Sequence, residues 1–371
     1  MKTRWYLLAA IMMTGCRVSD VVYLPGAGGD DADAGIDVPF CYGTAPFSVC
    51  FAAVPTGTIN IAMSTTFDTG TGLGNGTQLI CTTPMSGGAG YCVLAAATIT
   101  INARLRAVGT KPLVLVAADS IDVPTSIDVG SRQPPTEPIG AGSAPGAACT
   151  SGEIPGNSGG GAGGSFLGLG GTGGNGASAT AGGGVPGPAS DPPKVLRGGC
   201  PGQNGHAFVG ANTGFGGHGG GAVFLIAGNS ITVGGTLNAG GAGGGGGGNR
   251  GSDPRAGGGG GGAGGMIGLD APQVMVTGAL IANGGGGGEG NGTTNPGGSG
   301  MDADSTTAAA GGGNETTGGD GGAGSSGAAN SSGSSGLNAS GGGGGGGGGA
   351  GLILAPATAI LGPSVSPAAT R

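Results

Sequence analysis

Six cysteines are the residues of this chain whose chemistry is easiest to predict. They are Cys41, Cys50, Cys81, Cys92, Cys149 and Cys200. An even number of cysteines in an exported chain indicates disulfide bonds. The connectivity stays open, although pairing of sequence neighbours (Cys41 with Cys50, Cys81 with Cys92, Cys149 with Cys200) is the simplest arrangement. No Cys-x-x-Cys occurs, and His206 and His218 are distant from most cysteines, so disulfides are favoured over a metal site.

Asp119, Asp122 and Asp128 form the best acidic candidate for acid–base chemistry. Glycoside hydrolysis needs two carboxyl groups at a defined separation. These aspartates alternate with apolar residues, which is typical of outward, solvated positions on a strand. We expect Thr232, Met275 and Leu361 to occupy the position of Asp122 in later repeats. The sequence therefore predicts no ladder of carboxylates and no catalytic pair.

The remaining polar candidates are isolated. Arg197 lies near Cys200 and His218 is flanked by glycines, and structural or surface roles are expected for both. Chance matches to G-x-G-x-x-G carry no information in a glycine-rich chain that lacks the strand–turn–helix context. No Walker, H-E-x-x-H or G-x-S-x-G sequence occurs. We predict a protein that is not an enzyme, with no catalytic residue, no metal ligand and no cofactor.

The N-terminus has the pattern of an export signal. Basic MKTR precedes the apolar run Trp5–Thr14, which is too short to span a bilayer. The run ends in Met13-Thr14-Gly15-Cys16, which resembles a bacterial lipobox. That resemblance implies that residues 1–15 are a signal peptide and that Cys16 is lipidated and anchors the chain to a membrane. Arg17 after the cysteine favours the outer membrane, and an ordinary signal peptide with an incidental cysteine is the alternative.

Composition narrows the classes of function further. The 371 residues include 101 glycines but only 12 Lys and Arg and 19 Asp and Glu, for a net charge of −7. No basic run occurs, and nucleic-acid binding needs clustered cations, so no nucleic-acid partner is expected. Residues 16–39, with the run GAGGDDADAGID, are predicted to form an acidic flexible tether.

Five apolar segments of similar pattern predict the fold. They are Val93–Gly109, Leu113–Gly130, Val223–Gly241, Met266–Gly285 and Leu352–Pro367. Each has three short strands separated by small-residue corners, which is the pattern of one coil of a parallel β-solenoid (β-helix). The second strands begin with Ile99, Ile121, Ile231, Val274 and either Ala359 or Ile360, which would form an internal aliphatic ladder. We predict an all-β solenoid of about five coils over residues 93–371.

A disulfide-bearing N-terminal cap is predicted over residues 40–92. Terminal repeats of a solenoid are atypical because one end of the stack must be covered. Within this region, residues 48–62 have the pattern of a degenerate first coil.

Glycine-rich inserts interrupt the repeats at about 131–221, 240–265 and 284–350, and each follows the third strand of a coil. The inserts should therefore leave from one edge. Some glycines recur every third residue, in the rows Gly170–Gly176, Gly214–Gly220 and Gly318–Gly336. Polyproline-II-type helices have three residues per turn, so an ordered polyglycine-II bundle is one interpretation. Floppy loops are the other, because glycine loses the most backbone entropy on ordering.

The whole chain resembles uncharacterised glycine-rich secreted lipoproteins of myxobacterial type. The resemblance rests on the lipobox, the DDADAGID run and repeats such as GGHGGGAVFLIAGNSITVGGTLNAGG (Gly216–Gly241). It also resembles, more distantly, glycine-rich adhesins of bacterial surfaces. These resemblances imply a surface location and no known catalysis.

We therefore expect an exported, lipid-anchored structural or adhesive protein at the outer membrane or cell surface. Its expected partners are the membrane, through Cys16, and surface polysaccharide or other cells. One alternative is a carbohydrate-active β-helix enzyme, which would need convergent carboxylates across coils. Another is an ice- or polysaccharide-binding surface protein, which would need a flat outward row of threonines, and Thr98, Thr100 and Thr232 do not make one clearly.

Overall fold

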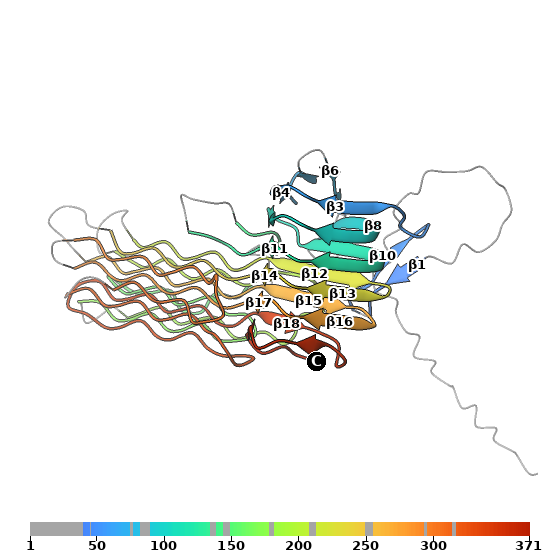
Figure 1. Ribbon diagram of the computed structural model, residues 1–371. Helices are drawn as coiled ribbons and strands as arrows, with labels where there is room; N and C mark the ends of the chain where they lie inside the picture. Colours follow the sequence, from blue (N-terminus) through green and yellow to red (C-terminus); the bar gives the residue numbers. More distant parts are fainter. Residues whose placement is uncertain are drawn as a thin grey trace, which may run out of the picture.

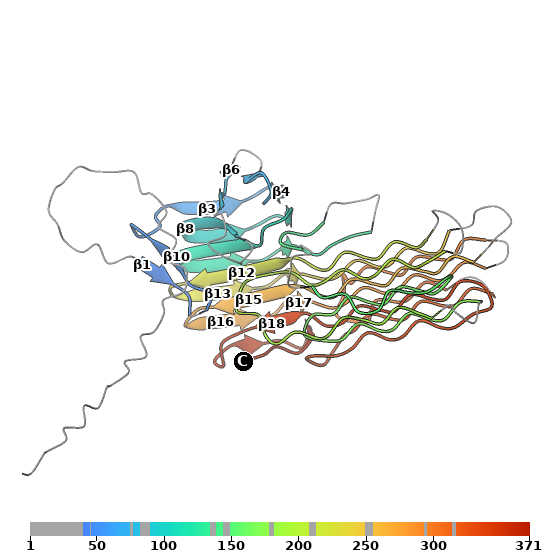
Figure 2. The ribbon, with the colours of Figure 1, turned by 180° about the vertical axis from the view of Figure 1, so that it is seen from behind.

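The computed structural model describes residues 40–44, 46–74, 77–81, 90–133, 139–143, 149–177, 182–207, 213–248, 255–292, 295–313 and 317–371. Within these ranges the protein is all-β and contains no helix (Figures 1 and 2). The predicted signal peptide (1–15), Cys16 and the tether (16–39) lie outside the described residues.

Ten strands form the larger sheet, which is strongly curled. They are β3 (Thr58–Ile61), β7 (Ile80–Cys81), β8 (Cys92–Ile101), β10 (Leu113–Val123), β12 (Ala222–Ala227), β13 (Ser230–Val233), β15 (Met266–Asp270), β16 (Gln273–Val276), β18 (Leu352–Leu354) and β19 (Ile360–Leu361). All pairs in this sheet are parallel except β7 with β8. In β8 and β10, the first and second strands predicted for a repeat join into one long strand.

A second sheet of eight strands contains the third strand of each repeat. It comprises β4 (Thr65–Asp68), β5 (Leu73–Gly74), β6 (Thr77–Gln78), β9 (Leu105–Val108), β11 (Ser126–Asp128), β14 (Thr236–Asn238), β17 (Ala279–Ile281) and β20 (Val365–Ser366). From β4 to β20 the strands are parallel, and β5 and β6 add antiparallel strands at the N-terminal edge. We call the two sheets together the β-stack. Figure 1 shows it running from β3 at one end to β18 and the C-terminus at the other.

Equivalent residues of successive repeats pair in register and point into the β-stack. One column contains Ile59, Ile99, Ile121, Ile231 and Val274. A second contains Leu94, Leu115, Leu225 and Leu269, and a third contains Leu105, Ile127, Leu237, Leu280 and Val365. Nearly all of these side chains are buried in one core. Each buried aliphatic side chain contributes about 1.5–3 kcal/mol before the entropy of ordering is subtracted. The predicted internal ladder is confirmed.

The last repeat corrects one expectation of the sequence. Met275 pairs with Ile360, so Ala359 lies opposite Val274 and takes the inward position. Ala359 is buried and Ile360 is exposed. The outward column of Asp122 therefore continues through Thr232, Met275 and Ile360, and the expectation of Leu361 there is wrong. Leu361 packs against the core instead.

The first strand of each repeat is buried on both faces, which explains the unbroken apolar runs LVLV and VFLI. On the outer face a second apolar cluster includes Val114, Val116, Phe224 and Ile226. The hairpin of β1 (Phe40–Tyr42) and β2 (Val49–Phe51) covers part of this face. At its tip, Thr44 donates from its N–H and Oγ1 to Asp270 Oδ2, at 2.6 and 2.8 Å.

The region predicted as a cap therefore has two parts. Residues of β3 and β4 extend the two parallel sheets by one turn, pairing with β8 and β9. Only the end of the predicted degenerate coil (48–62) belongs to that turn. Its beginning belongs to the β1–β2 hairpin, because antiparallel pairing and the disulfide between Cys41 and Cys50 hold it there.

The glycine-rich segments lie side by side and extend from one side of the β-stack, across the direction in which the strands are stacked (Figures 1 and 2). They follow β11, β14 and β17, as the shared exit edge predicts. We call the described residues of 149–221, 239–265 and 282–351 outside the strands the glycine bundle. Backbone hydrogen bonds between segments distant in sequence link it throughout, for example Gly161 N–H to Gly258 O and Gly258 N–H to Gly343 O.

The nine-glycine run Gly341–Gly349 is the centre of the bundle. From Gly342 to Gly349, successive N–H groups donate in turn to three different segments, at Gly285–Asn291, Ser158–Gly164 and Ser334–Leu337, so that each segment recurs every third residue. A methyl group on these same glycines would overlap carbonyl oxygens of three further segments, also with period three. The run therefore has neighbours on every side, and no position along it can hold a side chain.

Outer segments have most of their glycines on the sides that face a neighbour. Added methyl groups at Gly318, Gly321 and Gly324 would overlap the carbonyl oxygens of Gly290, Gly287 and Gly284 respectively. Between such glycines stand exposed residues such as Thr172, Asn175, Asp320, Ser335 and Asn338. The number of consecutive glycines in a segment thus reflects how many neighbours surround it.

Candidate functional site

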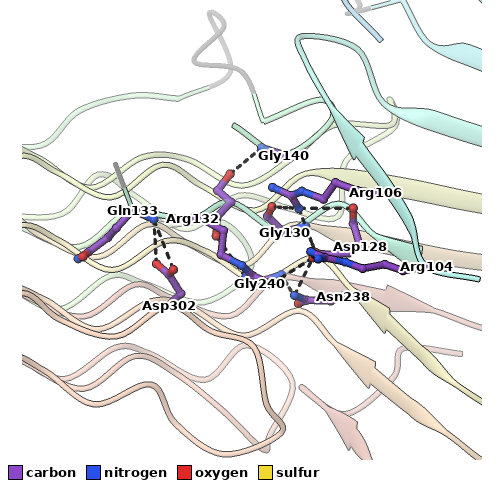
Figure 3. A network of polar contacts seen from close by, with 11 residues as sticks. Arg104, Arg106, Asp128, Gly130, Arg132, Gln133, Gly140, Asn238, Gly240 and Asp302 are labelled. Atoms are coloured by element: carbon purple, nitrogen blue, oxygen red, sulfur yellow. Dashed lines mark hydrogen bonds and ion pairs between the residues drawn. The ribbon is translucent and has the colours of Figure 1, made fainter. Parts of the chain in front are cut away.

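An ion cluster around the buried carboxylate of Asp128 lies where the β-stack meets the glycine bundle (Figure 3). Asp128, the last residue of β11, accepts hydrogen bonds from three arginines: Arg104 Nη2 at 2.9 Å, Arg106 Nη1 at 3.0 Å and Arg132 Nη2 at 3.2 Å. Its side chain is only 7% exposed. We call these four residues the Asp128 cluster.

Neighbouring backbone and amide groups complete the coordination of Asp128. The N–H of Gly130 and the Nδ2 of Asn238 both donate to Asp128 Oδ1. Asn238 is the residue of β14 that pairs with Asp128, and its own Oδ1 accepts from the N–H of Gly240. The same turn thus recurs in consecutive repeats at the point where the chain leaves a strand for the bundle.

Just beyond the cluster, Gln133 and Asp302 tie the segment that follows β11 to two segments of the glycine bundle (Figure 3). Gln133 Nε2 donates to the carbonyl oxygens of Gly244 and Gly300, both at 2.9 Å. Asp302 accepts from the N–H groups of Gln133 and Gly243. Burial raises the pKa of the Asp302 carboxyl, although these donors oppose the shift. The whole junction is structural, since each of these polar groups binds another part of the same chain.

The structure separates the three aspartates that the sequence grouped. Asp128 lies in the second sheet, within the cluster, whereas Asp119 and Asp122 lie on or beside the outward face of β10 in the larger sheet. Asp119 Oδ1 accepts from Asn229 Nδ2 at 3.3 Å, and Asp122 is exposed. No group of three or more His, Cys, Asp or Glu suited to a metal ion occurs in the described part of the chain. No helix there is long and apolar enough to cross a membrane.

Disulfide bonds join Cys41 to Cys50, Cys81 to Cys92, and Cys149 to Cys200, which is the arrangement that neighbour pairing gives. The third one lies within the glycine bundle, where Cys200 O accepts from the N–H of Ala263. It closes the longest loop of the three, with a sequence separation of 51.

Removing this bond should destabilise the bundle more than removing the bond of the N-terminal hairpin. By loop-closure entropy, the double substitution C149S/C200S is expected to lower the free energy of unfolding by about 4 kcal/mol, against about 2.5 kcal/mol for C41S/C50S. Chemical denaturation of both variants beside the wild type measures the difference. If C149S/C200S cost no more stability than C41S/C50S, the ordered bundle would be contradicted. A disulfide that closes a disordered loop does not stabilise a folded state.

Both histidines lie in the bundle. His206 is exposed, and its N–H donates to Gly159 O. His218 is half-buried, its carbonyl oxygen accepts from the N–H of Ala242, and burial lowers the pKa of its imidazole.

His218 should therefore make the bundle less stable in mild acid. The unfolded chain takes up a proton near the ordinary histidine pKa of about 6.5, while the folded chain resists protonation. The free energy of unfolding is expected to fall as the pH drops through that value and to level off below the folded-state pKa. His218→Gln should flatten this part of the profile, measured by thermal unfolding between pH 8 and pH 5. An identical slope in the variant and the wild type would disprove the role of His218.

Sequence reasoning missed the residues that build the junction. Arg106 was not singled out, although an arginine in the apolar strand LRAV carries a signal, because a charge on a buried face needs a partner. Asn238 and Gln133 gave no such signal.

No family model, no curated protein and no solved structure matches this chain.

Proposed function

We propose that the β-stack is a parallel β-solenoid of about five coils and that the glycine bundle consists of polyglycine-II helices. The in-register columns of Ile and Leu support the solenoid. The period of three in both the hydrogen bonds and the glycine contacts of Gly341–Gly349 supports the helices, which have three residues per turn.

On this architecture we infer a lipid-anchored protein of the cell surface with a structural or adhesive role and no catalysis. The observation that carries the proposal is the arrangement of two opposite sides of the β-stack. The β1 hairpin, which follows the predicted tether, lies on the side of the β-stack away from the glycine bundle (Figure 1). A chain held to a membrane through Cys16 would therefore present the bundle outward, toward surface polysaccharide or other cells.

A rigid bundle suits a structural or adhesive role, because backbone hydrogen bonds on several sides of each segment fix its packing. The outer segments carry exposed polar side chains, and some of them pair across neighbouring segments, since Thr172 Oγ1 donates to Ser335 Oγ at 2.8 Å. The three disulfides fit an oxidising, extracellular compartment.

Cys16→Ser tests the anchor and the role together. In producing cells that lack the wild-type protein, the variant is expected in the medium, with intact disulfides, and attachment of the cells to surfaces or to one another should fall to the level of the deletion strain. Wild-type chain should remain in the membrane fraction and be cut by protease added to intact cells. Membrane retention of the variant, or unchanged attachment after its release, would overturn the proposal.

A second candidate, binding to ice or to a regular polysaccharide, is favoured by the outward face of the larger sheet. One column there holds Thr58, Thr98, Ser120, Ser230 and Gln273 in register, and Thr100 and Thr232 flank Asp122 in the next. Thermal hysteresis and polysaccharide pull-down with Thr98→Leu/Ser230→Leu would distinguish this face from the bundle. A carbohydrate-active enzyme remains the other alternative, and release of reducing sugar by the wild-type chain would establish it.

A further inference from the structure

A small cavity opens at the side of the glycine bundle, beside the disulfide of Cys149 and Cys200. Segments at 149–151, 163–165, 187–190 and 200–203 line it, and its volume is about 140 Å³. Gly163 and Gly164 hydrogen-bond to the bundle interior, at Gly171 O and Gly261 O, so this wall belongs to the bundle lattice. The cavity is therefore held open by rigid backbone and a covalent cross-link.

A guanidinium group lies directly behind one wall of the cavity. Arg197 Nη2 donates to Oγ of Ser190, a lining residue, at 2.9 Å. Its other acceptors are Gly198 O and Cys200 Sγ, and it stacks on the Phe166 ring at 4.4 Å from the centroid. All of these partners are neutral, and no carboxylate of the described residues forms an ion pair with Arg197. Burial lowers the pKa of this guanidinium, as expected of a charge without a counterion.

The lining residues offer hydrogen-bond donors. Ser190 Oγ accepts from Arg197, so its own hydroxyl proton is available to a ligand. Thr150 and Ser151 add two exposed hydroxyls. The N–H groups of Ser151, Gly187 and Ala189 donate to no acceptor within the described residues. A half-buried cation close to several free hydrogen-bond donors is a setting that favours a small anion.

We propose that this cavity binds a carboxylate group, with Arg197 supplying the charge and Ser190 a direct hydrogen bond. A single guanidinium balances a single negative charge, which favours a carboxylate over a phosphate dianion. A neutral sugar would leave the cation uncompensated. The inference stands on the cavity alone and holds whether or not the chain is anchored at a cell surface. Two sources share this chemistry, a free small carboxylate and a uronic acid residue of an acidic polysaccharide.

Amide resonances of the purified full chain, followed during titration with sodium glucuronate, test the proposal. Glucose in matched sodium chloride is the neutral comparison. Glucuronate should shift the amide signals of Ser151, Gly187 and Ala189, and glucose should not. In a second arm, an oligomer of uronic acid that binds at least as tightly as the monomer would point to a polysaccharide, and weaker binding would point to a free carboxylate.

Three variants make the result specific to Arg197. Arg197→Gln should weaken glucuronate binding by about tenfold or more, because it removes the positive charge behind Ser190 that the carboxylate faces. Ser190→Ala retains the cation and should weaken binding by a smaller factor, which keeps the test open if Arg197→Gln unfolds. Lys194→Gln makes the same change in charge at an exposed position nearby and should have no effect. Equal binding of glucose, no shifts with glucuronate, or equal losses in Lys194→Gln and Arg197→Gln would overturn the assignment.

Discussion

Gly345→Ala is expected to destabilise the glycine bundle by about 3 kcal/mol or more, the range of overpacking in a rigid interior. A methyl group at this position would overlap the carbonyl group of Gly259, and backbone cannot move aside as a flexible side chain can. The same residue donates to Gly288 O and accepts from the N–H of Gly322, so any shift also strains two other segments. Thermal unfolding followed by circular dichroism measures the loss.

Gly182→Ala is the matched control. An added methyl group there has no atom within 4 Å, and the residue is exposed. This variant should stay within about 0.5 kcal/mol of the wild type, or be slightly more stable, because alanine restricts the unfolded chain. If the two variants were equally stable, the segments around Gly345 could not be packed as the structure shows.

Asp128→Asn is expected to cost about 3 kcal/mol, because one substitution leaves three guanidinium groups without their shared carboxylate. Removing one partner of a buried ion pair typically destabilises by about 3–5 kcal/mol. Only the pair with Arg106 is buried on both sides, since the Arg104 side chain is 48% exposed and gains less from the contact. The lower end of the range is therefore appropriate. Chemical denaturation monitored at the strands and at the bundle should show both affected, since the cluster joins them.

Asp122→Asn makes the same chemical change on the same strand–turn–strand unit. Its side chain is exposed and outward, opposite Thr232. The free energy of unfolding should change by no more than about 0.5 kcal/mol. A loss comparable to that of Asp128→Asn would show that the cluster does not stabilise the junction.

The strand regions were predictable because their signal is local. Alternation of Ile99 with polar neighbours, repeated at Ile121 and Ile231, indicates a strand with one buried face, and the structure places these residues in one column. The last repeat was harder, since both Ala359 and Ile360 are apolar and small shifts of register exchange their faces. Pairing with Met275 decides the register.

The glycine-rich segments could be located from the sequence, but the sequence did not decide whether they are ordered or disordered. Glycine has no side chain whose burial would reveal a packed state, so a disordered loop and a close-packed bundle share one composition. What distinguishes them is the match between segments far apart in the chain, such as Gly258 with Gly343, which no local pattern records. The period of three at Gly318–Gly324 was a partial signal, and it corresponds to contacts with Gly284–Gly290.

The junction was beyond sequence reasoning for a related reason. Asp128 looked like one of three outward aspartates, because alternation in the strand does not reveal that the following turn is covered by the bundle. Arg104 and Arg132 reach it from positions 24 residues before and 4 residues after. The ion pairs of Asp128 thus hold together residues from separate positions in the chain.

The proposed architecture depends most on the glycine bundle being ordered, and hydrogen–deuterium exchange of the backbone amides tests this directly. The amides of Gly342–Gly349 donate to three different segments and should exchange as slowly as those of β10 and β12. Fragments covering this run, separated by mass spectrometry after quenched digestion with a broad-specificity protease, give the rates. Slow exchange of the run confirms the bundle. Exchange at the rate of an unstructured peptide, while β10 and β12 stay protected, would contradict it and reduce the glycine-rich segments to flexible loops on a β-stack.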